Sequence, residues 1–145
     1  MDVDVVTDIV IASPIGDVSA FAGDPSNAPA WYVNIESVAW ESPPPMHVGS
    51  RIAFVARFLG RRLSYTYEIV DEVPGKRLVM RTSEGPFPME TTYEWAEVNG
   101  GTRMTLRNRG RPGGFSRLLS PFMPMAMKRA NRNDLKRLKV LLESR

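Results

Sequence analysis

The stretch YEWAEVNGGTRMTL, residues 93–106, sets the register of the sheet that this chain is expected to build. Two runs of β-forming residues flank Asn99 and Gly100, a pair typical of a two-residue hairpin turn. A turn at this place puts Thr91 opposite Asn108 on the neighbouring strand. Because side chains alternate along a strand, both residues then belong to the face that also carries the aromatic side chains of the hairpin. The hairpin therefore predicts an apolar inner face with a few polar groups in it.

The preceding stretch, RTSEGPFPMETTYEW at residues 81–95, raises the question of whether its carboxylates are catalytic. A tight turn after residue 84 pairs Arg81 with Glu90, and the hairpin described above pairs Glu90 with Arg109. Glu90 and Glu94 then point away from the core face. Cross-strand pairs of opposite charge stabilise a sheet by a few tenths of a kcal/mol each. We therefore interpret both glutamates as structural surface charges.

The rest of the chain reads as one α+β domain over residues 1–145. Strand-like runs alternate with turn residues, and the apolar period changes to three and four residues only near the C-terminus. We expect prolines 121 and 124 to kink or break the first turns of that last helix. The expected order is a strand at 3–12, two short helices ending near residue 31, strands at 35–41, 50–59, 62–73, 77–84, 87–98 and 102–109, and a long amphipathic helix from 115.

Composition excludes several kinds of chemistry. The chain has no cysteine, which rules out disulfides and thiolate metal sites. Its one histidine, His47, lies in a proline-rich connection, and we expect it to be an ordinary loop residue. We predict no metal site and no cofactor. The N-terminus does not have the order of a signal peptide, and no apolar run is long enough to span a membrane, so we expect a cytoplasmic protein.

Charge is distributed unevenly along the chain. Residues 1–102 carry 7 Lys/Arg and 14 Asp/Glu, a net charge of −7, whereas residues 103–145 carry 12 and 2, a net charge of +10. Such a division can mark a face for an anionic partner, or it can reflect an acidic sheet beside a basic strand and helix. The basic helix face would consist of Lys128, Arg129, Arg132, Lys136, Arg137 and Lys139.

The chain resembles the polyketide cyclase/dehydrase-like branch of the START and birch-pollen-allergen superfamily. Its element order carries the resemblance, together with the stretch VGSRIAFVARFLGRRLSYTYEIVDEVPGKRLVMRTSEG, the hairpin quoted first, and the terminal NRNDLKRLKVLL. The resemblance implies a helix-grip fold, in which a seven-stranded curved antiparallel sheet surrounds a long C-terminal helix and encloses an apolar cavity. The superfamily includes lipid carriers, hormone receptors and aromatase/cyclases. It has no universal catalytic motif, so the resemblance implies no catalytic residue, and fold alone does not give function.

Side-chain alternation and the helical period select the residues expected to line such a cavity. Methionines and aromatic residues suit an adaptable apolar pocket, and tyrosines or an asparagine can orient the oxygen atoms of a ligand. The alternative is that these side chains simply fill the core. The predicted ligand-binding residues are Phe54, Phe58, Tyr65, Tyr67, Met80, Thr82, Phe87, Met89, Thr91, Tyr93 and Asn108 on the strands, and Phe122, Met123, Met127 and Asn131 on the helix.

Glu84 shares its alternation with the inward residues Met80 and Thr82. It is therefore expected at the rim of the core face, either as a solvated turn residue or as a polar contact at the mouth of the cavity. We include it among the predicted ligand-binding residues.

Three functions remain open on the sequence. The first is a carrier, sensor or chaperone that binds a small hydrophobic or lipid-like molecule. The second is a cyclase or dehydratase that acts on a carbonyl compound, which needs an acid or base at the cavity wall, such as Glu84 or a tyrosine. The third is an interaction protein that uses the basic C-terminal face. We expect a monomer or homodimer whose partner is a small apolar ligand, and we do not expect nucleic-acid binding, because no aromatic residues interleave with the basic ones.

Overall fold

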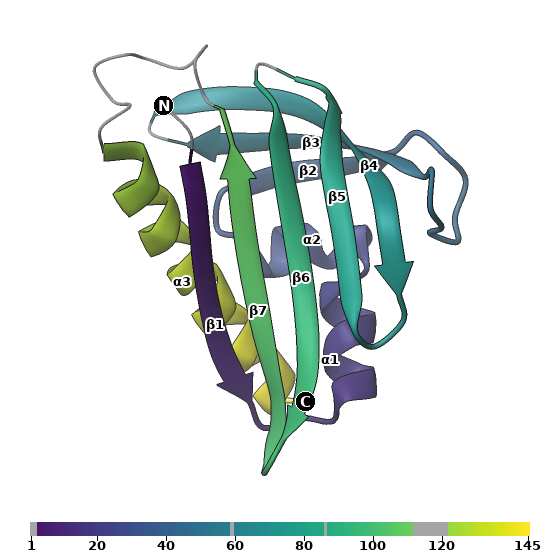
Figure 1. The fold of residues 1–145 in the computed structure, drawn as a ribbon, viewed down its shortest axis with the longest axis vertical. Coiled ribbons are helices and arrows are strands. Elements are labelled where there is room, and N and C mark those ends of the chain that lie inside the picture. The colour runs from purple at the N-terminus through teal and green to yellow at the C-terminus, as the bar shows by residue number, and fades with distance from the viewer. Residues whose placement is uncertain (1–2, 59, 86, 112–121) are drawn as a thin grey trace.

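A single curled antiparallel sheet grips one long helix (Figure 1). The computed structural model describes residues 3–58, 60–85, 87–111 and 122–145. The strand order across the sheet is β1-β7-β6-β5-β4-β3-β2. Six strands thus form a meander, and the first strand joins the sheet beyond the last one. The strands are β1 (Val3–Ile11), β2 (Ile35–Trp40), β3 (Arg51–Phe58), β4 (Arg61–Val73), β5 (Arg77–Glu84), β6 (Met89–Val98) and β7 (Gly101–Gly110).

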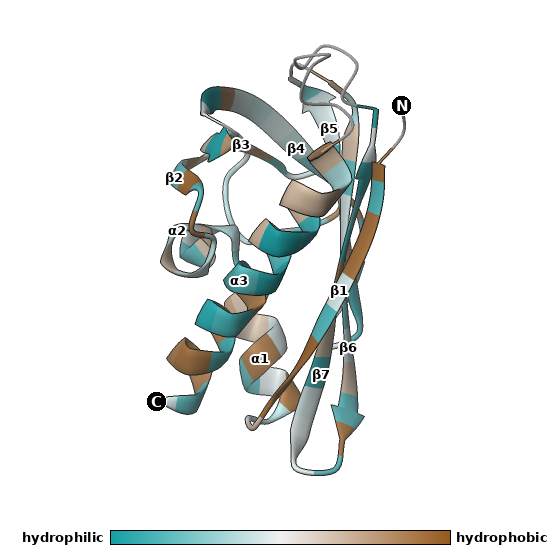
Figure 2. Ribbon diagram, turned by 90° about the vertical axis from the view of Figure 1, so that its left-hand side faces the viewer, coloured by the Kyte–Doolittle hydropathy of each residue, from teal (hydrophilic) through white to brown (hydrophobic). Residues whose placement is uncertain are grey.

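The helices lie on the concave side of the sheet. After β1 come α1 (Ile15–Ala22), the 3₁₀ turn η1 (Pro25–Asn27) and α2 (Ala28–Trp31), which correspond to the two short helices expected there. Figure 2 shows the long helix α3 (Met123–Glu143) crossing this side of the sheet, with β2, β3 and β4 curling past its N-terminal half. The predicted α+β helix-grip architecture is therefore confirmed.

The predicted registers are also confirmed. Thr91 pairs with Asn108 and Arg81 pairs with Glu90. The Glu90 carboxylate receives hydrogen bonds from Arg81 on one side, at 2.8 Å, and from Arg109 on the other, at 2.7 Å. Partial burial opposes ionisation of Glu90, but the hydrogen bonds from both arginines outweigh it and hold the pKa of this carboxyl below its ordinary value. Glu90 therefore ties three strands together on the outer face of the sheet.

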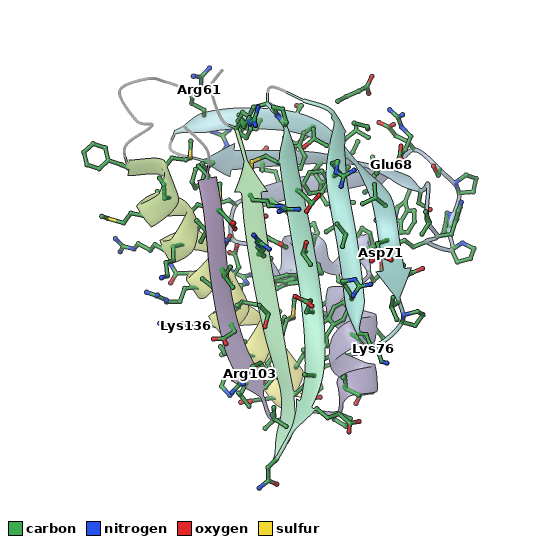
Figure 3. The ribbon with its side chains drawn as sticks, viewed as in Figure 1. Arg61, Glu68, Asp71, Lys76, Arg103 and Lys136 are labelled. Atoms are coloured by element: carbon green, nitrogen blue, oxygen red, sulfur yellow. The ribbon has the colours of Figure 1, made fainter. Side chains whose placement is uncertain are left out.

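Charged side chains cover the outside of the molecule. Figure 3 labels six of them, on the outer side of strands, in turns and on the solvent side of α3, and none of the six lines the cavity described below. Among the described helices, none is long and apolar enough to cross a membrane.

The apolar interior is divided into two clusters. The larger one holds the α3 leucines Leu135, Leu138 and Leu142 together with the core faces of the strands and of α1 and α2. The smaller one joins β1 to the first turns of α3, where Met123 and Met127 are buried. One helix thus serves both clusters, the larger with its C-terminal half and the smaller with its N-terminal turns.

Two boundaries differ from those expected. The strand β6 begins at Met89, two residues later than predicted, because the chain is still turning at Phe87. The described part of α3 begins at Met123, with Pro124 in its first turn, where a proline costs no helical hydrogen bond. The part of the predicted helix at residues 115–121, including proline 121, lies outside the described residues.

The Leu138→Ala variant tests how strongly α3 holds the fold. Leu138 is fully buried, so its truncation leaves a cavity and is expected to lower the free energy of unfolding by about 2–5 kcal/mol. The control is Val140→Ala on the same helix, where a 64% exposed side chain should change the free energy of unfolding by less than about 0.5 kcal/mol. Urea denaturation of both variants measures the difference. Equal, small effects would mean that α3 does not close the core.

Candidate ligand-binding site

A cavity of about 150 Å³ lies between the sheet and α3. Its wall takes side chains from both apolar clusters: Phe54, Tyr67 and Tyr93 from the larger, and Met123 and Met127 from the smaller. The cavity therefore lies where the two apolar clusters do not pack against each other. A gap of this kind loses packing energy in the empty protein, because the lining atoms lack partners on one side.

Fourteen of the sixteen residues predicted to contact a ligand line this cavity. Alternation placed Met80, Thr82, Thr91, Tyr93 and Asn108 at the cavity wall, because the predicted pairing of β5 with β6 and of β6 with β7 was correct. Contact with a ligand stays a prediction for all of them. The fourteen are Phe54, Phe58, Tyr65, Tyr67, Met80, Thr82, Phe87, Met89, Thr91, Tyr93, Asn108, Met123, Met127 and Asn131.

Glu84 does not line the cavity. Its side chain is 70% exposed and lies 3.4 Å from the Arg51 guanidinium. The extra residue Ser83 in β5 is the reason, since Thr82 pairs with the inward Tyr67 whereas Glu84 pairs with the neighbouring Thr66. One extra residue in a strand moves the following pairs to the other face. Of the two roles expected for Glu84, the structure places it as a surface residue.

Phe122 does not line the cavity either. It is the N-cap residue of α3 and is 61% exposed. The helical period placed it on the inner face, but that period holds only from the first residue with helical geometry onward, and that residue is Met123. The next turn, with Met127 and Asn131, follows the period and faces inward.

A chain of three polar side chains crosses the sheet wall of the cavity. The Thr91 hydroxyl donates to the Asn108 side-chain oxygen at 2.5 Å, and the Tyr67 hydroxyl lies 2.9 Å from the same Thr91 oxygen. All three residues are buried. Burial raises the pKa of Tyr67 to about 12, even though the hydrogen bond with Thr91 favours the ionised form. The Tyr67 hydroxyl therefore keeps its proton at neutral pH and can only act as a neutral group.

Sequence reasoning missed a second polar group at the helix side. The hydroxyls of Tyr32 and Tyr93 lie 2.6 Å apart, and the carboxylate of Asp134 lines the same cavity. Burial is the main reason why the pKa of each of the two phenols lies well above its ordinary value. Tyr32 could not be found by alternation, since it lies in the connection between α2 and β2.

Asp134 is the one carboxylate among the described residues of the cavity wall. It is 3% exposed and accepts a hydrogen bond from the Val33 backbone N–H at 3.0 Å. Burial raises the pKa of Asp134 from 3.8 to about 6, although the Val33 bond and the Arg137 charge oppose this rise. The helical period carried the signal, because Asp134 follows Asn131 by three residues and precedes Leu138 by four. Asp134 is not among the residues predicted to contact a ligand.

The described residues do not provide a metal site, because no three His, Asp or Glu side chains lie close enough together to hold a metal ion. His47 hydrogen-bonds within its own loop, to Pro45 and Ser50.

Part of the basic face of α3 stabilises the fold. Arg137 donates to the Ala30 carbonyl and Lys139 to the Val10 carbonyl. A role of this face in binding an anionic partner stays a prediction.

Comparisons with known proteins agree with this geometry. Residues 2–143 match the family model described as polyketide cyclase/dehydrase and lipid transport. No curated protein sequence matches the chain.

Solved structures share the fold at low sequence identity. A START superfamily protein from Mycobacterium smegmatis has a TM-score of 0.83 at 11% identity, with 97% of each chain covered. A protein of Thermus thermophilus has a TM-score of 0.82 at 21% identity, also with 97% of each chain covered. The aromatase/cyclase ZhuI from Streptomyces sp. R1128 has a TM-score of 0.81 at 14% identity, with coverage of 99% of this chain and 94% of that one.

The raised pKa of Asp134 predicts an unusual pH dependence of stability. Between pH 3.8 and about 6 the folded protein holds a proton that the unfolded chain has lost, so the contribution of Asp134 to stability falls as pH rises through this window. Asp134→Asn keeps an acceptor for the Val33 N–H and removes the titration. The variant is expected to gain stability over wild type as pH rises, by at most about 3 kcal/mol above pH 7. Urea unfolding of both proteins across this pH range measures the gain, and a difference independent of pH would contradict the assignment.

Proposed function

The chain belongs to the polyketide cyclase/dehydrase and lipid transport family, and from this premise we propose that it binds a small hydrophobic or lipid-like molecule in the cavity between the sheet and α3. The observation that carries the proposal is the cavity itself, which interrupts the core at a place where both walls are regular elements of the fold. Location in the cytoplasm, and the state as monomer or homodimer, remain predictions.

The wall has the composition of a ligand site. It is mainly apolar, and it includes two sets of hydrogen-bonded polar groups, the Tyr67–Thr91–Asn108 chain on the sheet and the tyrosine pair with Asp134 near the helix. Sites for small molecules typically combine an apolar lining with a small number of placed polar groups. An apolar cavity of this volume can hold a single aromatic ring, so the ligand in this conformation is compact rather than a long acyl chain.

Methionines make the wall adaptable. Met80 and Met89 come from the sheet, and Met123 and Met127 come from α3. An unbranched thioether side chain changes shape at low cost, so it can fill the cavity in the absence of a ligand and move aside for one. Larger ligands within the same chemical class are therefore compatible with this wall.

A second function, catalysis on a carbonyl compound as in a cyclase or dehydratase, is favoured by one observation. Asp134 lies at the cavity wall with a pKa of about 6, near the range in which a carboxyl group exchanges protons at neutral pH. The tyrosine pair beside it supplies hydroxyls that keep their protons. We place this function second, because a buried carboxyl that accepts a backbone hydrogen bond also has a structural role.

Mass spectrometry separates the two functions. Under native conditions it identifies a small molecule that copurifies with the protein, and the same molecule is then incubated with fresh protein. A carrier returns the molecule unchanged. Loss of water from it in the presence of wild type, but not of Asp134→Asn, would favour the enzyme instead.

The Ala56→Phe variant tests the cavity as a binding site. On the inner face of β3 the residues Ile52, Phe54 and Phe58 are large, and Ala56 is the small one at the cavity wall. A phenyl group at this position is expected to occupy the cavity, so the variant should keep a cooperative thermal transition and bind toluene at least about tenfold more weakly than wild type.

Ala53→Phe is the matched control, since Ala53 lies on the opposite face of the same strand. It should bind toluene as wild type does. Calorimetric titration measures binding, and a thermal melt verifies folding. If wild type itself binds no toluene, the proposal of an apolar ligand fails.

A further inference from the structure

The hydrogen bonds of the sheet wall fix where every proton of the polar chain goes. A threonine hydroxyl has one hydrogen, and Thr91 gives it to the Asn108 side-chain oxygen. The Tyr67 hydroxyl, which lies 2.9 Å from the Thr91 oxygen, must then be the donor in that contact. The hydrogen bonds therefore run in one direction, from Tyr67 through Thr91 to Asn108. The side-chain oxygen of Asn108 is occupied as an acceptor, and its amide nitrogen takes no part in this series.

The Asn108 amide nitrogen finds no acceptor among the described residues. Asn108 is only 8% exposed and its side chain lines the cavity. Across the cavity, Asn131 of α3 also lines the wall at 4% exposure, and its amide nitrogen has no partner in the part of the chain that the structure describes. A fully buried donor without a partner is rare in folded proteins, because it loses its hydrogen bonds to water without replacement. The Asn131 nitrogen is such a donor, and it shares the cavity with the Asn108 nitrogen, so an acceptor that arrives from outside can serve both.

We propose that Asn108 selects the ligand: the cavity takes a compact apolar molecule that carries a hydrogen-bond acceptor oxygen, and the Asn108 amide donates to that oxygen. This inference rests on the proposed function, since it names the class of ligand for the same cavity. Tyr67 and Thr91 act as positioning residues, because their directed hydrogen bonds hold the Asn108 oxygen away from the ligand and turn the nitrogen toward it. On the helix side of the cavity, the unpartnered amide of Asn131 requires an acceptor in the same way.

The expected selectivity is large relative to that of a purely apolar pocket. A pocket that offers only apolar contacts distinguishes weakly between molecules of equal shape, whereas a site built to hydrogen-bond a ligand rejects the analogue that leaves its polar group unpaired. The comparison must therefore use two probes of one shape. Acetophenone and α-methylstyrene differ only in the replacement of a carbonyl oxygen by a methylene group.

The experiment measures the affinities of wild type and Asn108→Leu for both probes by calorimetric titration. Leucine branches at the same carbon as asparagine and offers no donor. For each protein we take the ratio of its affinity for α-methylstyrene to its affinity for acetophenone. Dividing the ratio of the variant by the ratio of wild type cancels the difference in hydration between the probes. We expect this quotient to be at least about ten for Asn108→Leu, which corresponds to about 1.4 kcal/mol.

A matched control lies on the opposite face of β6. Thr92 follows Thr91 on this strand and does not line the cavity. Thr92→Val should leave the quotient near one. Thr91→Val keeps the Asn108 amide but removes the hydroxyl that orients it, and it should shift the quotient in the same direction as Asn108→Leu by a smaller factor. If Asn108→Leu does not fold, Thr91→Val provides the test.

The outcomes separate the inference from the proposed function. Both probes can bind wild type while the quotient stays near one in Asn108→Leu, or in Thr91→Val if Asn108→Leu does not fold. The cavity then binds apolar molecules but Asn108 does not select them. This result overturns the inference and leaves the proposed function standing. If neither probe binds wild type, the inference and the proposed function fail together. A shift of equal size in Thr92→Val would show that a change outside the wall alters the ratio as well, and it would also overturn the inference.

Discussion

The packing of α3 into the curled sheet is the contact on which the rest of this structure depends. Toward its C-terminal end the helix presents Leu135, Leu138 and Leu142, which close the larger part of the core. Within the turn before Leu135 the inward positions are Asn131 and Asp134, and there the core opens into the cavity. A single helix thus stabilises the fold at one end and limits the packing at the other. The curved sheet offers a concave face along the whole helix. The position of the cavity is therefore determined by the side chains that the helix presents to this face.

Polar groups in this cavity work against stability. The carboxyl group of Asp134 is buried, the buried amide nitrogen of Asn131 lacks a partner among the described residues, and the phenol pair of Tyr32 and Tyr93 is removed from water. Each of these features is more costly than an apolar side chain of the same size. Natural proteins break the rules of good packing mainly at functional sites. The concentration of such features around one cavity is the physical reason for regarding it as the site.

The sheet could be predicted from local signals, whereas parts of the site could not. The Asn99–Gly100 turn specifies a register, and the register places Thr91 and Asn108 together on the inner face. Glu84 was misplaced because a bulge in β5 at Ser83 shifts the alternation, and no residue type in the sequence marks that bulge. Tyr32 was missed because it lies in a connection, where no period applies. Asp134 follows the helical period from Asn131, but a charged residue gives no local signal that it is buried.

The pairing of β1 with β7 constrains the order in which the chain can fold. The register joins Val3 to Gly110, so the first strand pairs with one that is made roughly a hundred residues later. Contacts between such distant segments close slowly, because a long loop must be ordered before they form. During synthesis β1 emerges with neither edge paired, and the meander from β2 to β7 can assemble before it. We expect the two walls of the cavity to meet only when α3 docks on the sheet, so that a ligand of the proposed kind would be enclosed at that moment.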